Sequence, residues 1–227
     1  RKYLHIGDVA ELTTLDANGG SFVDPTAALK YMPKLKTLLA EYNGFKSIDI
    51  SNHPVVMDKL LLDSNPYFTT LTAKSNRVKE IHLSYSNISN TILTNALNAC
   101  SGTVYVYGNY GPQLLTLNTT YNASLTMQNT NRILKLTKCN FNTLKFGGSR
   151  LWFAGDLAAC KVNNLILQRT GSTSSGVIEV NFATADVALS VIQKIATGKT
   201  GMGVKVKIVF STGSATTIRI PATIFAI

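Results

Sequence analysis

Charged side chains are scarce in this sequence of 227 residues. Lys, Arg, Asp and Glu together make up 15% of it, against about 25% in a typical soluble domain. Long apolar runs are also missing, since stretches such as Leu60–Leu62 and Val204–Phe210 are far too short to span a bilayer. We therefore expect no membrane span, while a hydrophobic content of 45% excludes a mostly disordered chain.

Cysteine is rare as well. Cys100, Cys139 and Cys160 are the only three, and none of them belongs to a CxxC pair. An odd number without metal-ligand spacing predicts neither a disulfide framework nor a metal centre. Because the chain begins at Arg1 rather than Met, we expect it to be a processed product or an excised piece.

Uncharged polar residues take the place of the missing charges. The sequence contains 26 Thr and 19 Asn. Thr favours strands, and Asn favours tight turns. This composition predicts a β-rich protein with many corners.

One short pattern recurs along the chain: an aliphatic residue, any residue, an aliphatic residue, and then small or polar residues that often include Asn. Neighbouring copies mostly start about 10 residues apart. The copies begin at Ile48, Leu60, Leu71, Ile81, Val104, Leu115, Leu125, Leu134, Leu144 and Leu165.

Strand geometry explains this pattern. Successive side chains of a strand point to opposite faces, so the two aliphatics of each copy point inward and the residue between them points outward. A following Asn turns the corner, because its short amide bonds nearby backbone and tolerates the left-handed conformation. Two strands and two corners make one coil of about 21 residues, and stacked coils bury a shared apolar row. The expected fold is an α/β solenoid of short parallel strands with a few helices.

The segment from Leu35 to Ile50 is the clearest coil, with Leu35, Leu38 and Asn43 followed by a second short strand. It resembles the leucine-rich repeat family, above all the short-repeat kind of Bacteroidetes surface proteins and some phage proteins. The resemblance covers roughly residues 9–168. It implies a solenoid that recognises or adheres to a partner at a cell surface, or a component of a virion.

Helical spacing interrupts the repeat in three places. We expect a short helix from Asp24-Pro25 to Tyr31, a helix over Thr91–Cys100 with Asn90 as its N-cap, and a helix over Thr184–Thr197. The linker-like stretch Gly171–Gly176 precedes a β-α-β-β pattern. We therefore predict a solenoid over residues 1–170 and an α+β cap over residues 171–227 that closes its end.

Catalytic motifs are not apparent. Gly198-Lys199-Thr200 ends like a phosphate-binding loop, but the earlier glycine of that motif is replaced by Gln193, and the stretch follows a helix. None of His5, His53 and His82 has a nucleophile or carboxylate at an interpretable spacing. We predict that the chain is not an enzyme and needs no cofactor.

A β-solenoid carbohydrate-active enzyme is the alternative to that prediction. Asp49 and Asp63, with Asp58 near them, are the carboxylates that could serve it.

The outward middle positions of the strands are the candidate binding face. Tyrosine rings provide rigid contact area there, and Lys, His and Gln provide hydrogen bonds. This face predicts a non-catalytic recognition or adhesion module, extracellular or at a cell surface. A structural virion component that packs against neighbouring subunits is the alternative. The candidate residues are His82, Tyr105, Tyr107, Lys135, Lys145 and Gln168.

The net charge of +10 is uneven. Residues 128–227 carry 12 Lys or Arg and only 3 Asp or Glu. This half predicts a protein or acidic-glycan partner, whereas the lack of interleaved aromatic residues disfavours nucleic acid. Lys135 and Lys145 form one basic strip only if successive repeat units share a face. Other expected contributors are Lys138, Arg150 and Arg169.

Overall fold

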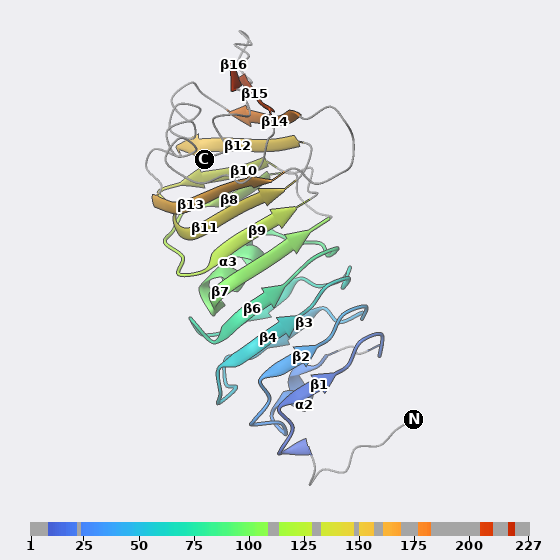
Figure 1. Ribbon diagram of the computed structural model, residues 1–227. Helices are drawn as coiled ribbons and strands as arrows, with labels where there is room; N and C mark the ends of the chain where they lie inside the picture. The colour runs from blue at the N-terminus through green and yellow to red at the C-terminus, as the bar shows by residue number, and fades with distance from the viewer. Residues whose placement is uncertain are drawn as a thin grey trace. The chain divides into compact units, whose positions relative to one another are not determined.

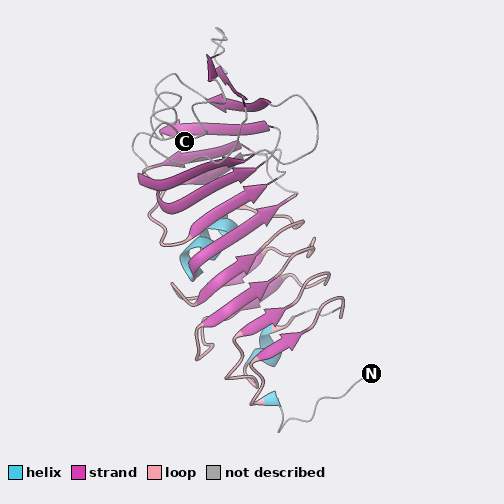
Figure 2. Cartoon of the chain, viewed as in Figure 1, coloured by secondary structure: helices cyan, strands magenta, loops and turns pink. Residues whose placement is uncertain are grey.

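Most of the described chain is β-strand. The computed structural model describes residues 9–21, 24–108, 114–128, 133–147, 150–156, 161–168, 177–182, 205–210 and 218–220. In this part of the chain, short strands form largely parallel sheets with few helices, a composition compatible with the α/β class (Figures 1 and 2). Within these residues, no helix has the length and hydrophobicity needed to cross a membrane.

Contacts divide the chain into two compact units, residues 1–111 and 112–227. The predicted boundary at residue 170 stays a prediction. In the first unit, one parallel sheet has the order β1-β2-β4-β6-β7, and a second contains β3 and β5. The strands of the first sheet are Thr14–Asp16, Thr37–Leu39, Met57–Leu61, Val78–His82 and Cys100–Tyr107; those of the second are Ser47–Asp49 and Thr70–Thr72.

Register places equivalent inward residues side by side. Leu38 pairs with Leu60, Leu60 with Ile81, and Ile81 with Val104, and partners lie 21 to 23 residues apart in the chain. All four side chains are at most 1% exposed. The predicted inward pairs Leu60/Leu62 and Ile81/Leu83 are buried, as expected from strand alternation.

Asparagines fix the corners that follow these strands. The Asn65 side-chain amide, which is fully buried, donates to the carbonyls of Ala40, Leu62 and Asp63 at 3.0, 2.9 and 3.1 Å. Its Oδ1 accepts from the Asn43 N–H at 3.1 Å. Asn43 occupies the same place one coil earlier and donates to the carbonyls of Ala17 and Glu41. The predicted hydrogen bonding of the corner amide to nearby backbone is confirmed at both positions, but the left-handed residue is the one before each asparagine, Tyr42 and Ser64.

Helices α2 and α3 of the first unit were both expected, but their first and last residues differ from the predicted ones. Helix α3 spans Asn90–Ala99, and Cys100 already belongs to β7. Its N-cap is Ser89, not the predicted Asn90, because the Ser89 hydroxyl accepts from the Ile92 N–H at 3.3 Å. Helix α2 is limited to Thr26–Leu29.

The second unit contains two sets of strands. The strands β9 (Ser124–Gln128), β11 (Asn140–Gly147) and β13 (Lys161–Gln168) pair in parallel. A second sheet has the order β8-β10-β12-β14-β15, all parallel, with β16 added antiparallel. Its strands are Leu114–Leu117, Ile133–Thr137, Arg150–Asp156, Val177–Phe182, Lys205–Phe210 and Ile218–Ile220.

Successive repeat units of this part lie in different sheets. Leu115 pairs with Leu134, and Leu125 pairs with Leu144. The strands expected for the C-terminal cap are present as β14, β15 and β16. The predicted helix Thr184–Thr197 and the Gly198-Lys199-Thr200 motif lie outside the described residues.

Candidate functional site

Three of the six predicted site residues come together on the outward face of the first unit. His82 ends β6, and register pairs it with Tyr105 of β7. The rings of His82 and Tyr105 have centroids 4.4 Å apart and are inclined by 36°. Tyr107 follows at 6.0 Å from Tyr105 in an edge-on arrangement. The three rings therefore form one aromatic row across two neighbouring strands.

Two carboxylates hold the imidazole of His82. Its Nε2 lies 3.0 Å from Glu80 Oε1, and its Nδ1 lies 3.7 Å from Asp63 Oδ2. Lys59 Nζ contacts the same Glu80 oxygen at 3.2 Å, and Asp63 also accepts from the backbone N–H of Ser84. The His82 side chain is 20% exposed. The predicted outward position of His82 does not make it freely exposed, because neighbouring side chains cover much of its ring.

The charges of this cluster depend on one another. Burial lowers the pKa of His82, but hydrogen bonds and charge attraction from Asp63 and Glu80 outweigh it and raise the pKa above its ordinary value. Burial opposes ionisation of Glu80, yet Lys59 and His82 lower its pKa overall. Since both ring nitrogens face carboxylates, the site favours the imidazolium rather than a general base with a free nitrogen.

These partners were missed by the sequence analysis. Glu80 stands two residues before His82, so strand alternation alone puts both on one face. That signal was present in the sequence. Asp63 belongs to the preceding coil, and its position opposite Ser84 and His82 depends on the register between coils. No spacing within one strand indicates it.

The other three candidates do not join this site. Lys135 lies on β10 and is exposed, whereas Lys145 lies on β11 and is half-buried. These strands belong to different sheets, so the two lysines do not form one basic strip. Gln168 ends β13, and its side chain lies outside the described residues, as do those of Arg150 and Arg169. Lys138 is exposed beyond the end of β10.

The carboxylates considered for glycoside cleavage are dispersed. Asp49 ends β3 of the two-stranded sheet, and its Oδ1 accepts from the Ser51 N–H at 2.8 Å. Asp63 follows β4 of the other sheet. Asp58 forms an ion pair of 2.7 Å with Lys79. The pair suggested by the sequence, Asp49 and Asp63, therefore lies on two separate sheets.

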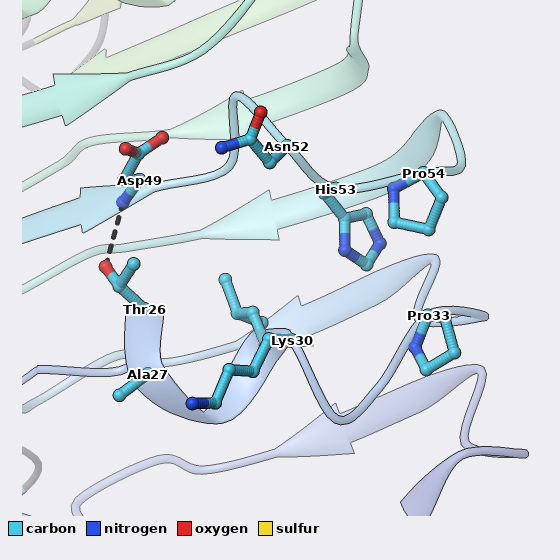
Figure 3. A pocket seen from close by; sticks show the side chains of 9 residues that line it. Thr26, Ala27, Lys30, Pro33, Asp49, Asn52, His53 and Pro54 are labelled. Carbon is cyan, nitrogen blue, oxygen red and sulfur yellow. Dashed lines mark hydrogen bonds between the residues drawn. The ribbon is translucent and has the colours of Figure 1, made fainter.

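A cavity of about 430 Å³ lies between α2 and the segment after β3 (Figure 3). The ring of His53 stands beside Pro54, and Lys30, which directly follows α2, lies on the facing wall. His53 is buried, with Nε2 2.7 Å from the carbonyl oxygen of Leu35, so backbone contact accounts for its position. Among the residues that the structure describes, no three His, Cys, Asp or Glu side chains are grouped to hold a metal ion.

Comparisons with protein-family models, curated proteins and solved structures found no match.

Proposed function

We propose that the chain is a non-catalytic recognition module. It binds a protein or glycan partner through the outward face of β4, β6 and β7, and it acts at a cell surface or on a phage particle. The aromatic row of His82, Tyr105 and Tyr107 carries this proposal. Aromatic rings held in fixed positions give a ligand contact area at little entropic cost.

The surroundings of the row support the same function. Lys59, Glu80 and Asp63 fix the imidazole of His82, so these polar groups are ordered before a ligand arrives. Preorganisation of this kind reduces the entropic cost of binding. Hydrogen-bond donors and acceptors beside an aromatic face suit either a polypeptide or a sugar.

The proposal includes a leucine-rich-repeat-like solenoid as the scaffold. Parallel pairing between strands one coil apart supports it, as does the fully buried corner Asn65. Each coil would add one outward residue to each row, and the recognition face would extend across neighbouring coils.

Binding to a glycan array and to a displayed peptide library tests the function. Tyr105→Ala and Tyr107→Ala should each weaken a genuine interaction by about five- to thirtyfold, the range for loss of an interface side chain worth 1–2 kcal/mol. Tyr67→Ala is the matched control, because Tyr67 is an exposed tyrosine outside the row. Ligands that bind both row variants as well as the parent protein would contradict the proposal.

Two further measurements address the alternatives. Light scattering on the purified chain would favour a structural virion component if it showed self-association that Tyr105→Ala leaves intact. Incubation with a polysaccharide panel would favour an enzyme if products appeared and were lost in Asp63→Ala. Monomeric protein that releases no product and binds through the row agrees with recognition.

A further inference from the structure

Five corners at the ends of the strands repeat one unusual backbone conformation. Residues after β1, β2, β4, β6 and β7 have φ between 52° and 62°, in the left-handed region. At each of the first four corners, the backbone N–H of the left-handed residue donates to a backbone carbonyl of the next coil, at 2.8 to 3.0 Å. The accepting residue comes directly before the next left-handed residue. The five corner residues are Gly19, Tyr42, Ser64, Tyr85 and Gly108.

Tyrosine is an energetically unfavourable residue at these left-handed corners. Glycine adopts the left-handed conformation freely, whereas an ordinary L-residue is destabilised there by about 1–2 kcal/mol. Tyr42 is 69% exposed and Tyr85 is 51% exposed, so burial of their rings offsets only part of this destabilisation. Residues with a strained backbone tend to cluster at functional sites, and a strained residue whose side chain is not packed in the core fits that pattern. The two rings are therefore better explained by something outside the chain than by the core.

The ring of Tyr85 also has a defined place. A Cβ atom added to Gly108 would lie 2.4 Å from Tyr85 Cε1. The ring thus lies directly over the next corner, and a Cβ atom at position 108 would force it to move. The backbone N–H of Tyr85 donates to the carbonyl of Tyr107, which connects this corner to the aromatic row.

The same edge is acidic. We define the strand-end edge as residues 16–19, 39–42, 61–64, 82–85 and 105–108; this set contains Asp16, Glu41 and Asp63 but no Lys or Arg. His82 is its only basic side chain. Glu41 is bonded to the neutral amide of Asn18 at 3.1 Å, so no cation neutralises it in that contact. Tyrosine faces beside carboxylates are complementary to a guanidinium or ammonium group.

We propose that the strand-end edge docks an extended polypeptide segment that carries arginine or lysine side chains. Tyr42 and Tyr85 contact the cationic groups through their ring faces, and Asp16 and Glu41 supply the opposite charge. This inference rests on the proposed recognition function and names the class of its partner. Acidic glycans would be repelled here, and a neutral sugar would gain no charge attraction from Asp16 and Glu41.

Corner spacing sets the separation of the cations. Tyr42 and Tyr85 are two strand positions apart, with Ser64 between them. At about 4.8 Å per strand, their backbones lie roughly 10 Å from each other. An extended segment in the polyproline II conformation has three residues per turn and rises about 3.1 Å per residue, so side chains three positions apart lie on one face, about 9 Å from each other. Two arginines separated by two residues therefore fit the edge.

Fluorescence polarisation with labelled GRGGRG, GQGGQG and GEGGEG peptides tests the proposal on the full chain. The arginine peptide should bind at least about tenfold more tightly than the glutamine peptide, and its affinity should fall as NaCl rises from about 50 to about 300 mM, because exposed charges are then screened. Tyr42→Gly and Tyr85→Gly should each weaken it about two- to fivefold, the effect of one exposed cation–π contact.

Glycine is the informative replacement because it fits the corner conformation, so a loss of binding cannot be assigned to a damaged fold. Tyr67→Gly, outside the edge, should leave binding unchanged. Equal affinity for the arginine and glutamine peptides, or indifference to the combined Tyr42 and Tyr85 variant, would overturn the inference. Glycan binding that depends on Tyr105, with no binding of GRGGRG, would refute the inference and leave the proposed function standing.

Discussion

Replacing Asn65 with Ala should destabilise the fold far more than replacing any exposed asparagine. Asn65 is fully buried at the corner after β4, and its side chain joins two neighbouring coils. The amide has two hydrogens and shares them among the carbonyls of Ala40, Leu62 and Asp63. Its oxygen accepts from the Asn43 N–H. The substitution therefore removes four hydrogen-bond contacts, which are worth about three full bonds because two hydrogens are shared among three carbonyls, and it takes the Asn65 oxygen away from the Asn43 N–H.

The magnitude follows from those bonds. Each buried hydrogen bond contributes about 1 kcal/mol net, and an unsatisfied buried group costs about 1–3 kcal/mol more. We expect Asn65→Ala to lower the free energy of unfolding by about 3–5 kcal/mol. Asn65→Asp should lose at least as much, because a carboxylate would face three carbonyl oxygens in place of an amide donor.

Urea denaturation followed by circular dichroism measures this free energy. Asn18→Ala is the matched control, since Asn18 also bonds the next coil, through Glu41, but at an exposed corner. Water can replace those bonds, so the control should lose less than about 1 kcal/mol. If Asn65→Ala also lost less than about 1 kcal/mol with an unchanged denaturant slope, the assigned role of the corner asparagines would be refuted.

Three further predictions concern the core, the histidine cluster and a thiol. Leu83→Asp should abolish the native circular dichroism spectrum, because it buries a charge in the fully buried inward row, whereas Leu83→Met should not. The parent protein should be more stable than His82→Gln by about 1 kcal/mol. This difference should be largest between pH 4.5 and 6.5, which are the ordinary pKa values of Glu and His side chains. It should disappear as pH rises through the raised pKa of His82, and also as pH falls through the lowered pKa of Glu80; a difference that grows above pH 8 would contradict the cluster. Burial raises the pKa of the Cys100 thiol to about 11. In the Cys139→Ser, Cys160→Ser variant, the Cys100 thiol should therefore react with a disulfide reagent at pH 8 only after the chain is unfolded. Rapid labelling of the folded protein would show that this thiol is accessible.

Much of the strand arrangement could be predicted because its cause is local. Each of the ten repeat copies lies in or directly overlaps a strand, from Ile48 in β3 to Leu165 in β13. Because one face of each strand is buried and the other exposed, apolar residues recur at every second position, and a short stretch of sequence is enough to show this alternation. The strand β12 was missed, since Leu151-Trp152-Phe153 is followed by Ala-Gly-Asp rather than a corner Asn.

Helix ends and the site were harder to predict, for physical reasons. Ser89 and Asn90 are both competent N-caps, and only the hydrogen bond to Ile92 selects Ser89. Coils of the first unit differ in length by up to two residues, so register between coils cannot be counted from the sequence. The contact of Asp63 with His82 depends on that register.

Neighbouring corner positions show how stability and recognition are divided in this protein. Asn65 points inward and stabilises the stack through buried hydrogen bonds, so a polar residue there strengthens the fold. The corner residue one place earlier in the chain, Ser64, donates its backbone N–H to the next coil, and its side chain is only partly buried. Glycine would be the most stable choice at that outward place, and the protein has it at Gly19 and Gly108. Tyr42 and Tyr85 depart from it and remain 69% and 51% exposed. Packing explains the first kind of residue completely and does not explain the second, so binding is the place to seek the reason for the two tyrosines.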